Sequence, residues 1–100
     1  MNRIVKNYYV YILTNRNNNV LYIGVTNNLF ARSFQHKLKE NKSGFTAKYN
    51  VNKLVYYEIY GYIQDAIVRE KQVKKWKRQW KINLIIKENP EWRDMFEDML

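Results

Sequence analysis

The sequence contains no cysteine, a single proline and only nine acidic side chains among its 100 residues. The absence of cysteine excludes disulfide bonds and thiolate zinc sites. No apolar run is long enough to cross a bilayer, and the tyrosine-rich segment near the N-terminus lacks a small-residue cleavage site. We therefore expect neither a membrane-spanning helix nor a signal peptide, and a cytoplasmic location is compatible with this composition.

No internal repeat, linker or low-complexity segment divides the chain. Its length therefore predicts one domain over residues 1–100. A chain of this size can bury a hydrophobic core without cross-links. We expect a monomer.

Positive charge is concentrated in one part of the chain. There are 18 basic and 9 acidic side chains, a net charge of +9. Residues 67–82 hold seven lysines or arginines and one glutamate, whereas the residues after 82 hold five acidic and two basic side chains. Such a surface favours a polyanion as partner, with nucleic acid ahead of an anionic membrane. The candidate phosphate contacts are Lys71, Lys74, Lys75, Lys77 and Arg78. The alternative is a solvated face that only keeps the protein soluble.

Three strands are predicted in the first 60 residues. Residues 8–14 and 20–25 are β-branched and aromatic runs around an asparagine-rich turn, which indicates an antiparallel hairpin, and residues 54–60 form a third strand. Between the second and third of these strands we expect a helix that begins at the capping candidates 26–28, ends at about residue 40 and buries one apolar stripe. The members of that stripe are Phe30, Phe34 and Leu38. Residues 41–52 are predicted to form a loop with room for a short turn.

The rest of the chain is predicted to be helical. Helices are expected over residues 63–78 and 80–88, the second with Ile82, Ile85 and Ile86 as its apolar face. A short acidic helix is expected over 91–100, with Pro90 in its first turn. The order ββαβααα predicts an α+β fold, with a small three-stranded, largely antiparallel sheet flanked by helices.

Glu70 is the most informative single residue. On the predicted helix the apolar positions Ala66, Ile67, Val73, Trp76 and Trp80 form one stripe, and Glu70 falls inside it. A carboxylate turned toward a protein interior is unfavourable unless a positive group satisfies it. A metal ion could do so, and so could Lys74, four residues further along the helix.

Five features in order resemble one nuclease family. Tyr-Val-Tyr at 9–11 and Tyr-Ile-Gly at 22–24, one on each strand of the hairpin, resemble the paired motifs of the GIY-YIG family. Arg32 follows ten residues after the second tyrosine, His36 follows four further on, and Glu70 lies on a later helix. The resemblance covers nearly the whole chain.

Two further segments bear on that resemblance. The tail at 89–94, Asn-Pro-Glu-Trp-Arg-Asp, is similar to the small single-domain bacterial branch of the family. Tyr9 departs from the pattern, because the family has a glycine there, but that position serves the backbone rather than the chemistry.

The resemblance implies metal-dependent cleavage of DNA phosphodiester bonds, with Mg²⁺ or Mn²⁺ at a single site and no small-molecule cofactor. The implied site residues are Tyr11, Tyr22, Arg32, His36 and Glu70. Glu70 would hold the metal. A late asparagine often lies near the family's site, and Asn83 and Asn89 both compete for that place.

The residue types suit this chemistry. The planar fork of Arg32 matches phosphate oxygens. A tyrosine whose pKa is depressed by a nearby cation could take a proton from water, and His36 could orient that tyrosine or relay the proton. Tyr11 and Tyr22 must then project from the same face of the sheet, which one pairing register permits and the register shifted by one residue forbids.

Other interpretations stay open. Each residue could be an ordinary strand aromatic, surface charge or structural histidine, and the tryptophans at 76, 80 and 92 are expected in the core. The main alternative function is a non-catalytic nucleic-acid-binding module that keeps the fold and the basic face, with RNA as well as DNA as a ligand. A protein-interaction domain is a third.

Overall fold

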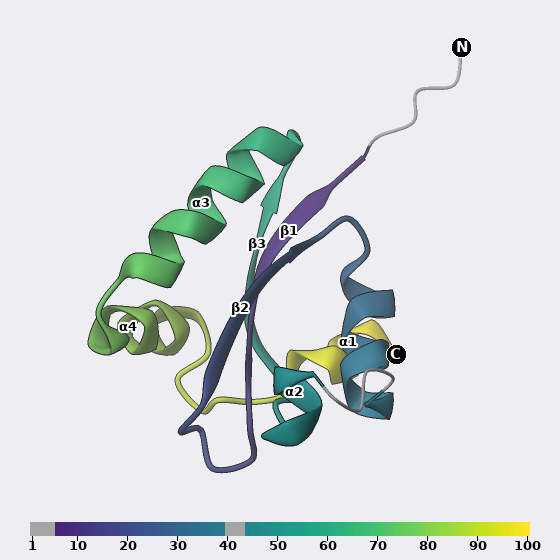
Figure 1. Ribbon diagram of the computed structural model, residues 1–100, viewed down its shortest axis with the longest axis vertical. Helices are drawn as coiled ribbons and strands as arrows, with labels where there is room; N and C mark the ends of the chain where they lie inside the picture. Colours follow the sequence, from purple (N-terminus) through teal and green to yellow (C-terminus); the bar gives the residue numbers. More distant parts are fainter. Residues whose placement is uncertain (1–5, 40–43) are drawn as a thin grey trace.

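A three-stranded antiparallel sheet forms the centre of the molecule. The computed structural model describes residues 6–39 and 44–100. Its strands are β1 (Tyr8–Thr14), β2 (Leu21–Thr26) and β3 (Lys53–Tyr60), arranged in the order β2-β1-β3. The predicted α+β class and the antiparallel sheet are confirmed (Figure 1).

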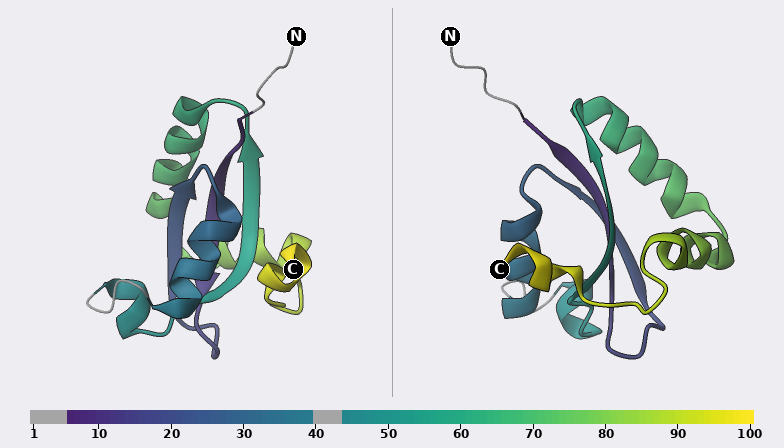
Figure 2. Two further views of the ribbon diagram at one scale, coloured as in Figure 1. Left: turned by 90° about the vertical axis from the view of Figure 1, so that its right-hand side faces the viewer. Right: turned by 180° about the vertical axis from the view of Figure 1, so that it is seen from behind.

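Helices cover both faces of this sheet (Figures 1 and 2). One face carries α3 (Ile63–Lys75) and α4 (Arg78–Glu88). The other carries α1 (Leu29–Leu38), α2 (Phe45–Lys48) and the C-terminal 3-10 helix η1 (Met95–Met99). In the left view of Figure 2, α2 lies toward β2 and η1 lies toward β3. No helix within residues 6–39 and 44–100 is long and apolar enough to traverse a bilayer.

Alternation along β1 creates two separate cores. Val10 and Ile12 pack in the cluster beneath α3 and α4, whereas Tyr11 and Leu13 pack in the cluster on the α1 side. Successive side chains of a strand point to opposite faces, so one strand serves both layers. A bulge in β3, between the partners of Ile12 and Leu13, keeps this alternation in step across the sheet.

The hairpin turn is held by its asparagines, as the composition predicted. The Asn15 side chain accepts hydrogen bonds from the backbone N–H groups of Asn19 (3.0 Å) and Val20 (3.2 Å). Asn18 adopts a left-handed conformation with φ of 59°, which asparagine tolerates better than most residues.

The start of α1 follows the predicted capping pattern. The side chain of Asn28 accepts from the Ala31 N–H at 3.0 Å and so caps the helix. The predicted buried stripe of this helix is wrong. All three of its members are exposed, namely Phe30, Phe34 and Leu38.

Leu29 and Ser33 face the sheet instead. Phe30 and Phe34 lie beside them and stack on Phe96 of η1, with ring centroids 5.4 and 6.4 Å apart. The helix is therefore rotated from the predicted orientation, because the C-terminal segment offers an aromatic partner that no local periodicity reveals.

The long basic helix is shorter than predicted. It ends at Lys75 rather than at residue 78, and α4 begins at Arg78 rather than at residue 80. Trp76 has extended backbone, which separates the two helices. Ala66 and Val73 are buried as expected, but Trp80 falls on α4 and is exposed, so its predicted place in the core is wrong. On α4 only Ile85 is buried, and Ile86 is exposed.

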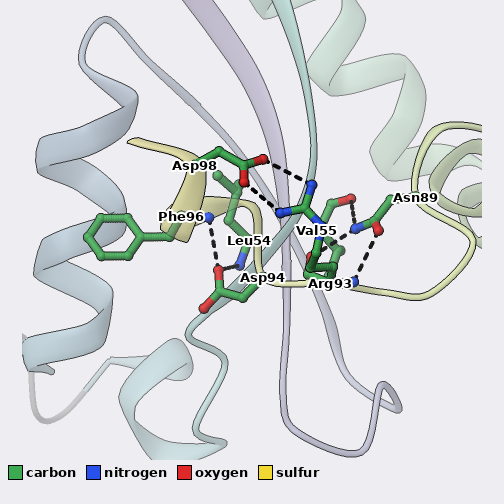
Figure 3. A network of polar contacts seen from close by, with 7 residues as sticks. All are labelled: Leu54, Val55, Asn89, Arg93, Asp94, Phe96 and Asp98. Carbon is green, nitrogen blue, oxygen red and sulfur yellow. Dashed lines mark hydrogen bonds and ion pairs between the residues drawn. The ribbon is translucent and has the colours of Figure 1, made fainter. Parts of the chain in front are cut away.

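The predicted helix over residues 91–100 is also wrong, because only Met95–Met99 is helical and its geometry is 3-10. The side chain of Asn89 turns the chain between the end of α4 and the start of η1 (Figure 3). Its amide donates to the carbonyls of Val55 (3.1 Å) and Arg93 (2.8 Å), and its side-chain oxygen accepts from the Arg93 N–H. Trp92 has a left-handed φ of 56°, which a continuous α-helix does not allow.

Asp94 fastens this tail to the sheet (Figure 3). Its Oδ1 accepts from the backbone N–H groups of Leu54 (3.1 Å) and Phe96 (3.0 Å), and its Oδ2 pairs with Lys37 of α1. These contacts join η1, β3 and α1, and they hold α1 over the face of the sheet that carries the candidate site.

Candidate active site

Tyr11 and Tyr22 project from the same face of the sheet. The register pairs Tyr11 with Gly24 and Leu13 with Tyr22, which places the two tyrosines on adjacent strands of one face. Their ring centroids are 6.2 Å apart. Of the two registers that the sequence allowed, the structure has the one that brings the phenols together.

Gly24 makes room for the Tyr11 phenol. A Cβ atom at residue 24 would lie 2.5 Å from both Cζ and Oη of Tyr11, well inside van der Waals contact. No glycine among the described residues has a positive φ, so the requirement is steric rather than conformational. The group that approaches this glycine closely is therefore the Tyr11 phenol.

His36 reaches the phenols from α1. Its Nε2 lies 3.5 Å from the Tyr11 hydroxyl, and its Nδ1 lies 3.0 Å from Oγ1 of Thr46 on α2. Both ring nitrogens are satisfied when Tyr11 donates to Nε2 and His36 donates its Nδ1–H to Thr46. The imidazole therefore links β1 to α2.

The two titratable groups of this link are both neutral near pH 7. Burial raises the pKa of Tyr11, electrostatic repulsion from Tyr22 and Glu70 raises it further, and Arg32 acts in the opposite direction. Burial lowers the pKa of His36, and the positive charge of Arg32 lowers it again. In the free protein burial outweighs the effect of Arg32, so the pKa of Tyr11 is raised rather than depressed.

A pocket of about 490 Å³ opens beside this cluster. Its lining residues are Tyr22, Arg32, Gln35, His36, Lys39, Gly44, Phe45 and Thr46. Among these lining residues, which leave out the undescribed segment 40–43, none is a carboxylate, and two carry permanent positive charge. Its size and charge suit a phosphate group with part of its nucleotide.

Glu70 approaches the site from the other layer of the molecule. Its side chain is 16% exposed and forms an ion pair with Lys74 at 3.1 Å, the local pairing that the spacing allowed. Glu70 does not line the pocket, yet its charge is close enough to raise the pKa of Tyr11. The structure thus brings Tyr11, Tyr22, Arg32 and His36 together, with the Glu70 carboxylate acting on this group at longer range.

The basic residues predicted to contact phosphates are all exposed. They lie on α3, on α4 and in the connection between them, over the face of the sheet opposite α1 and α2 (Figure 1). Arg78 donates to the carbonyls of Asn18 (3.4 Å) and Asn19 (2.8 Å), so it also braces the hairpin turn. The basic face and the pocket therefore belong to different layers of the molecule.

Neither candidate asparagine lines the pocket. Asn89 is buried, and its amide is committed to the C-terminal turn described above. Asn83 is exposed on α4 and accepts a hydrogen bond from Gln79 at 2.8 Å. Thr46 and Phe45 were not predicted as site residues, because residues 41–52 were expected to form a loop with room for a short turn. Residues 41–43 lie outside the described part of the chain, and Phe45–Lys48 form the short helix α2.

Glu58 is a second partly buried carboxylate that was not predicted, and both of its oxygens are hydrogen-bonded within the protein. Glu58 on β3 receives two hydrogen bonds from Arg69, each 2.9 Å, and one each from the hydroxyls of Tyr56 and Tyr60. Arg69 in turn lies 4.9 Å from the centre of the Trp76 ring. With both oxygens used twice, Glu58 binds α3 to the sheet and has no acceptor left for a ligand.

Comparisons with known proteins define the family. The model of the GIY-YIG catalytic domain matches residues 7–83, so the chain belongs to this family. Members of the family are generally endonucleases, and the domain is therefore of nuclease type with nucleic acid as its substrate class.

The fold is also similar to a solved structure. The UPF0213 protein BH0048 from Bacillus halodurans, determined by solution NMR, superimposes with a TM-score of 0.56 at 24% identity over 89% of this chain and 93% of that one. This likeness supports the fold alone. No curated protein matches the chain significantly.

Proposed function

We propose that this protein is a divalent-metal-dependent DNA endonuclease that hydrolyses phosphodiester bonds at the pocket beside β2 and α1. The observation that carries the proposal is that Tyr22, His36 and Arg32 line one pocket, while the buried phenol of Tyr11 lies against His36 behind it; the lining residues that the structure describes include no carboxylate. Such a lining attracts a phosphodiester and supplies both proton-transfer groups and positive charge.

Arg32 binds the phosphate in this proposal. It is exposed, lines the pocket and acts electrostatically on both Tyr11 and His36. Its guanidinium can donate two parallel hydrogen bonds to phosphate oxygens and balance the charge that develops on them during attack by water.

Tyr11 and His36 handle the proton. Burial raises the pKa of Tyr11 and keeps its phenol protonated in the free protein, so Tyr11 can act as a base only if it gives its own proton to another group. His36 is neutral, and its Nε2 faces the phenol oxygen at 3.5 Å. In this proposal Tyr11 passes its proton to His36 in the same step in which it takes one from the attacking water, because burial favours neither a phenolate nor an imidazolium on its own, and Thr46 keeps the imidazole in the required tautomer. Tyr22 borders the pocket and orients the water or the phosphate.

Glu70 holds the metal in this proposal. A lone carboxylate suits Mg²⁺ or Mn²⁺, which take oxygen ligands and keep several waters, and the described residues contain no cluster of three or more metal-ligating side chains that would favour another ion. When bound, the ion would supply positive charge and polarise phosphate oxygens. Lys74 occupies one oxygen of Glu70 and must give it up.

The first experiment measures nicking of supercoiled and branched DNA in Mg²⁺. We expect Glu70→Gln and Arg32→Lys to lower the cleavage rate by about 10²–10³-fold, since each removes a group that stabilises developing charge. Glu88→Gln, an exposed carboxylate at the end of α4, is the matched control and should cut like the wild type. Full cleavage by Glu70→Gln would show that the activity has another origin.

A second outcome separates catalysis from binding. Salt-sensitive DNA binding without cleavage in Mg²⁺ or Mn²⁺ would overturn the enzyme assignment and leave a binding module with a basic surface.

The ion pair between Glu70 and Lys74 allows a separate test of the metal site. Lys74→Met frees the carboxylate, so the Mg²⁺ concentration for half-maximal cleavage should fall by about twofold to fivefold, the usual size of such a pair. Lys71→Met removes the same charge from the neighbouring turn and is the control. An equal shift in both variants would mean that Lys74 acts only through net charge.

A further inference from the structure

A row of aromatic side chains runs from the pocket into solvent. The rings of Tyr22 and Phe45 stack with centroids 6.4 Å apart and planes inclined by 27°. The ring of Tyr49 follows, 4.8 Å from that of Phe45. Phe45 and Tyr49 are 49% and 44% exposed. Both belong to α2 or its C-terminal cap, and α2 buries none of its residues.

The exposure of this row has no structural explanation. Aromatic residues stabilise a fold mainly through the area that they bury. Here the outer two rings keep nearly half of their surface in solvent, and the four-residue helix that carries them contributes nothing to either core cluster. The row is instead continuous with Tyr22, which borders the pocket of the proposed nuclease site.

The charges around the row favour a nucleic-acid strand as its occupant. Arg32 and Lys39 line the same pocket, and Nζ of Lys48 lies 5.4 Å from the centre of the Tyr49 ring. Cations interleaved with exposed rings form the pattern that holds single strands, in which the cations follow the phosphates and the rings stack on bases. An uncharged apolar partner would not require three cations beside the pocket and the row of rings.

We propose that Phe45 and Tyr49 stack on unpaired bases next to the cleaved phosphate, so that this protein prefers single-stranded or locally unpaired DNA to intact duplex. The proposal rests on the nuclease function above and specifies its substrate class. A base in a duplex has both faces covered by its neighbours, and only an unpaired nucleotide offers a free face to a protein ring.

Binding without metal tests the stacking separately from catalysis. Fluorescence anisotropy in EDTA would compare a labelled single strand with the duplex of the same sequence and length. We expect Phe45→Leu and Tyr49→Leu to weaken single-strand binding by about 5- to 150-fold each, because one lost stack is worth that factor. Leucine preserves the apolar volume, and Phe45→Trp should bind like the wild type.

Tyr62→Leu is the matched control. Tyr62 is 72% exposed at the start of α3, on the opposite face of the sheet, so its replacement should leave affinity unchanged. A strand containing 2-aminopurine adds a direct signal, since its fluorescence should be quenched by the wild type and not by Phe45→Leu. Equal affinity for strand and duplex, or unchanged binding and quenching in a folded Phe45→Leu variant, would overturn the proposal.

The two proposals fail in different ways. Quenching that depends on Phe45, without cleavage in any divalent ion, would support the stacking row and remove the nuclease function. Cleavage that is equally fast on duplex and single strand, and that survives Phe45→Leu, would support the nuclease function and remove the stacking row.

Discussion

Gly24→Ala should damage the candidate site through a single methyl group. The added carbon would meet Cζ and Oη of Tyr11 at 2.5 Å, whereas carbon atoms in good contact lie about 3.5–4.0 Å apart. The phenol must therefore move by about 1 Å. Tyr11 is 2% exposed and lies inside a packed cluster, so its ring cannot move away without disturbing its neighbours.

The size of the clash allows the loss of stability and the loss of cleavage rate to be estimated. Overpacking of this kind lowers the free energy of unfolding by about 1–3 kcal/mol. Alanine restricts the unfolded chain more than glycine does, and this offsets the loss in unfolding free energy by about 0.4–1 kcal/mol. A displacement of about 1 Å at a reacting group lowers a rate by about 10²-fold. We therefore expect a modest loss of stability and a much larger loss of the proposed cleavage.

Urea denaturation and the plasmid-nicking assay would measure the two effects. Gly61→Ala is the matched control, because a Cβ at Gly61 meets nothing within 4 Å and its φ is not positive. It should keep wild-type cleavage and equal or slightly higher stability. A Gly24→Ala protein with unchanged stability and cleavage would refute the steric argument.

A double-mutant cycle identifies the partner in the clash. Tyr11→Leu removes the two atoms that the new methyl would meet, so Gly24→Ala should cost far less stability in that background than in the wild type. Additive losses would mean that the methyl group clashes with something other than the phenol.

Three further predictions concern stability. Arg69→Met should lower the free energy of unfolding by about 1–3 kcal/mol at pH 7, because it leaves the partly buried Glu58 with only its two tyrosine donors. Burial alone would raise the pKa of Glu58, but its hydrogen bonds lower that pKa below the ordinary 4.5. The difference in unfolding free energy between the wild type and Arg69→Met should therefore shrink as pH falls below 4.5. Burial and the nearby Arg32 lower the pKa of His36 from 6.5. As pH drops below 6.5, His36 therefore gains a proton more readily in the unfolded chain than in the folded protein, and the free energy of unfolding should fall. This fall should be absent in His36→Gln. Asp94→Ala leaves two backbone amides without their acceptor and should cost about 1–3 kcal/mol, whereas Asp98→Ala, in an exposed pair, should change nothing measurable.

Each of these has a clear contrary result. A constant difference between Arg69→Met and wild type down to pH 3 would mean that Glu58 does not depend on its charge. An unchanged pH profile in His36→Gln would assign the titration to another group. Equal losses in Asp94→Ala and Asp98→Ala would mean that charge, rather than the hydrogen bonds to the sheet, holds the tail in place.

Local signals predicted the sheet well. The boundaries of the hairpin came from β-branched and aromatic runs on either side of asparagines, and these act through neighbouring residues only. The start of α1 was equally local, since one Asn28 side chain caps it. The candidate residues on these elements came from the resemblance to the GIY-YIG family, and the structure places Tyr11 and Tyr22 on paired strands and Arg32 and His36 on one helix.

Non-local contacts explain the failures. Phe30 and Phe34 have helical spacing, but they pack against Phe96, more than sixty residues further along the sequence, at the side of α1 rather than in the core. The C-terminal helix was predicted from composition, yet the Asn89 side chain bonds to β3 and turns the chain. The role of α2 was hidden for the same reason, because Thr46 matters only once His36 is beside it.

By itself the sequence determined the strands and the charge bias, because propensity, capping and net charge are properties of short segments, and its resemblance to the GIY-YIG family supplied the candidate site residues. Only the tertiary structure decided the register that places Tyr11 beside Tyr22, the burial that raises the pKa of Tyr11, and the separation of the basic face from the pocket. Those depend on which surfaces meet across the sheet, and a one-residue shift in the pairing of β2 with β1 would have put Tyr22 on the opposite face from Tyr11.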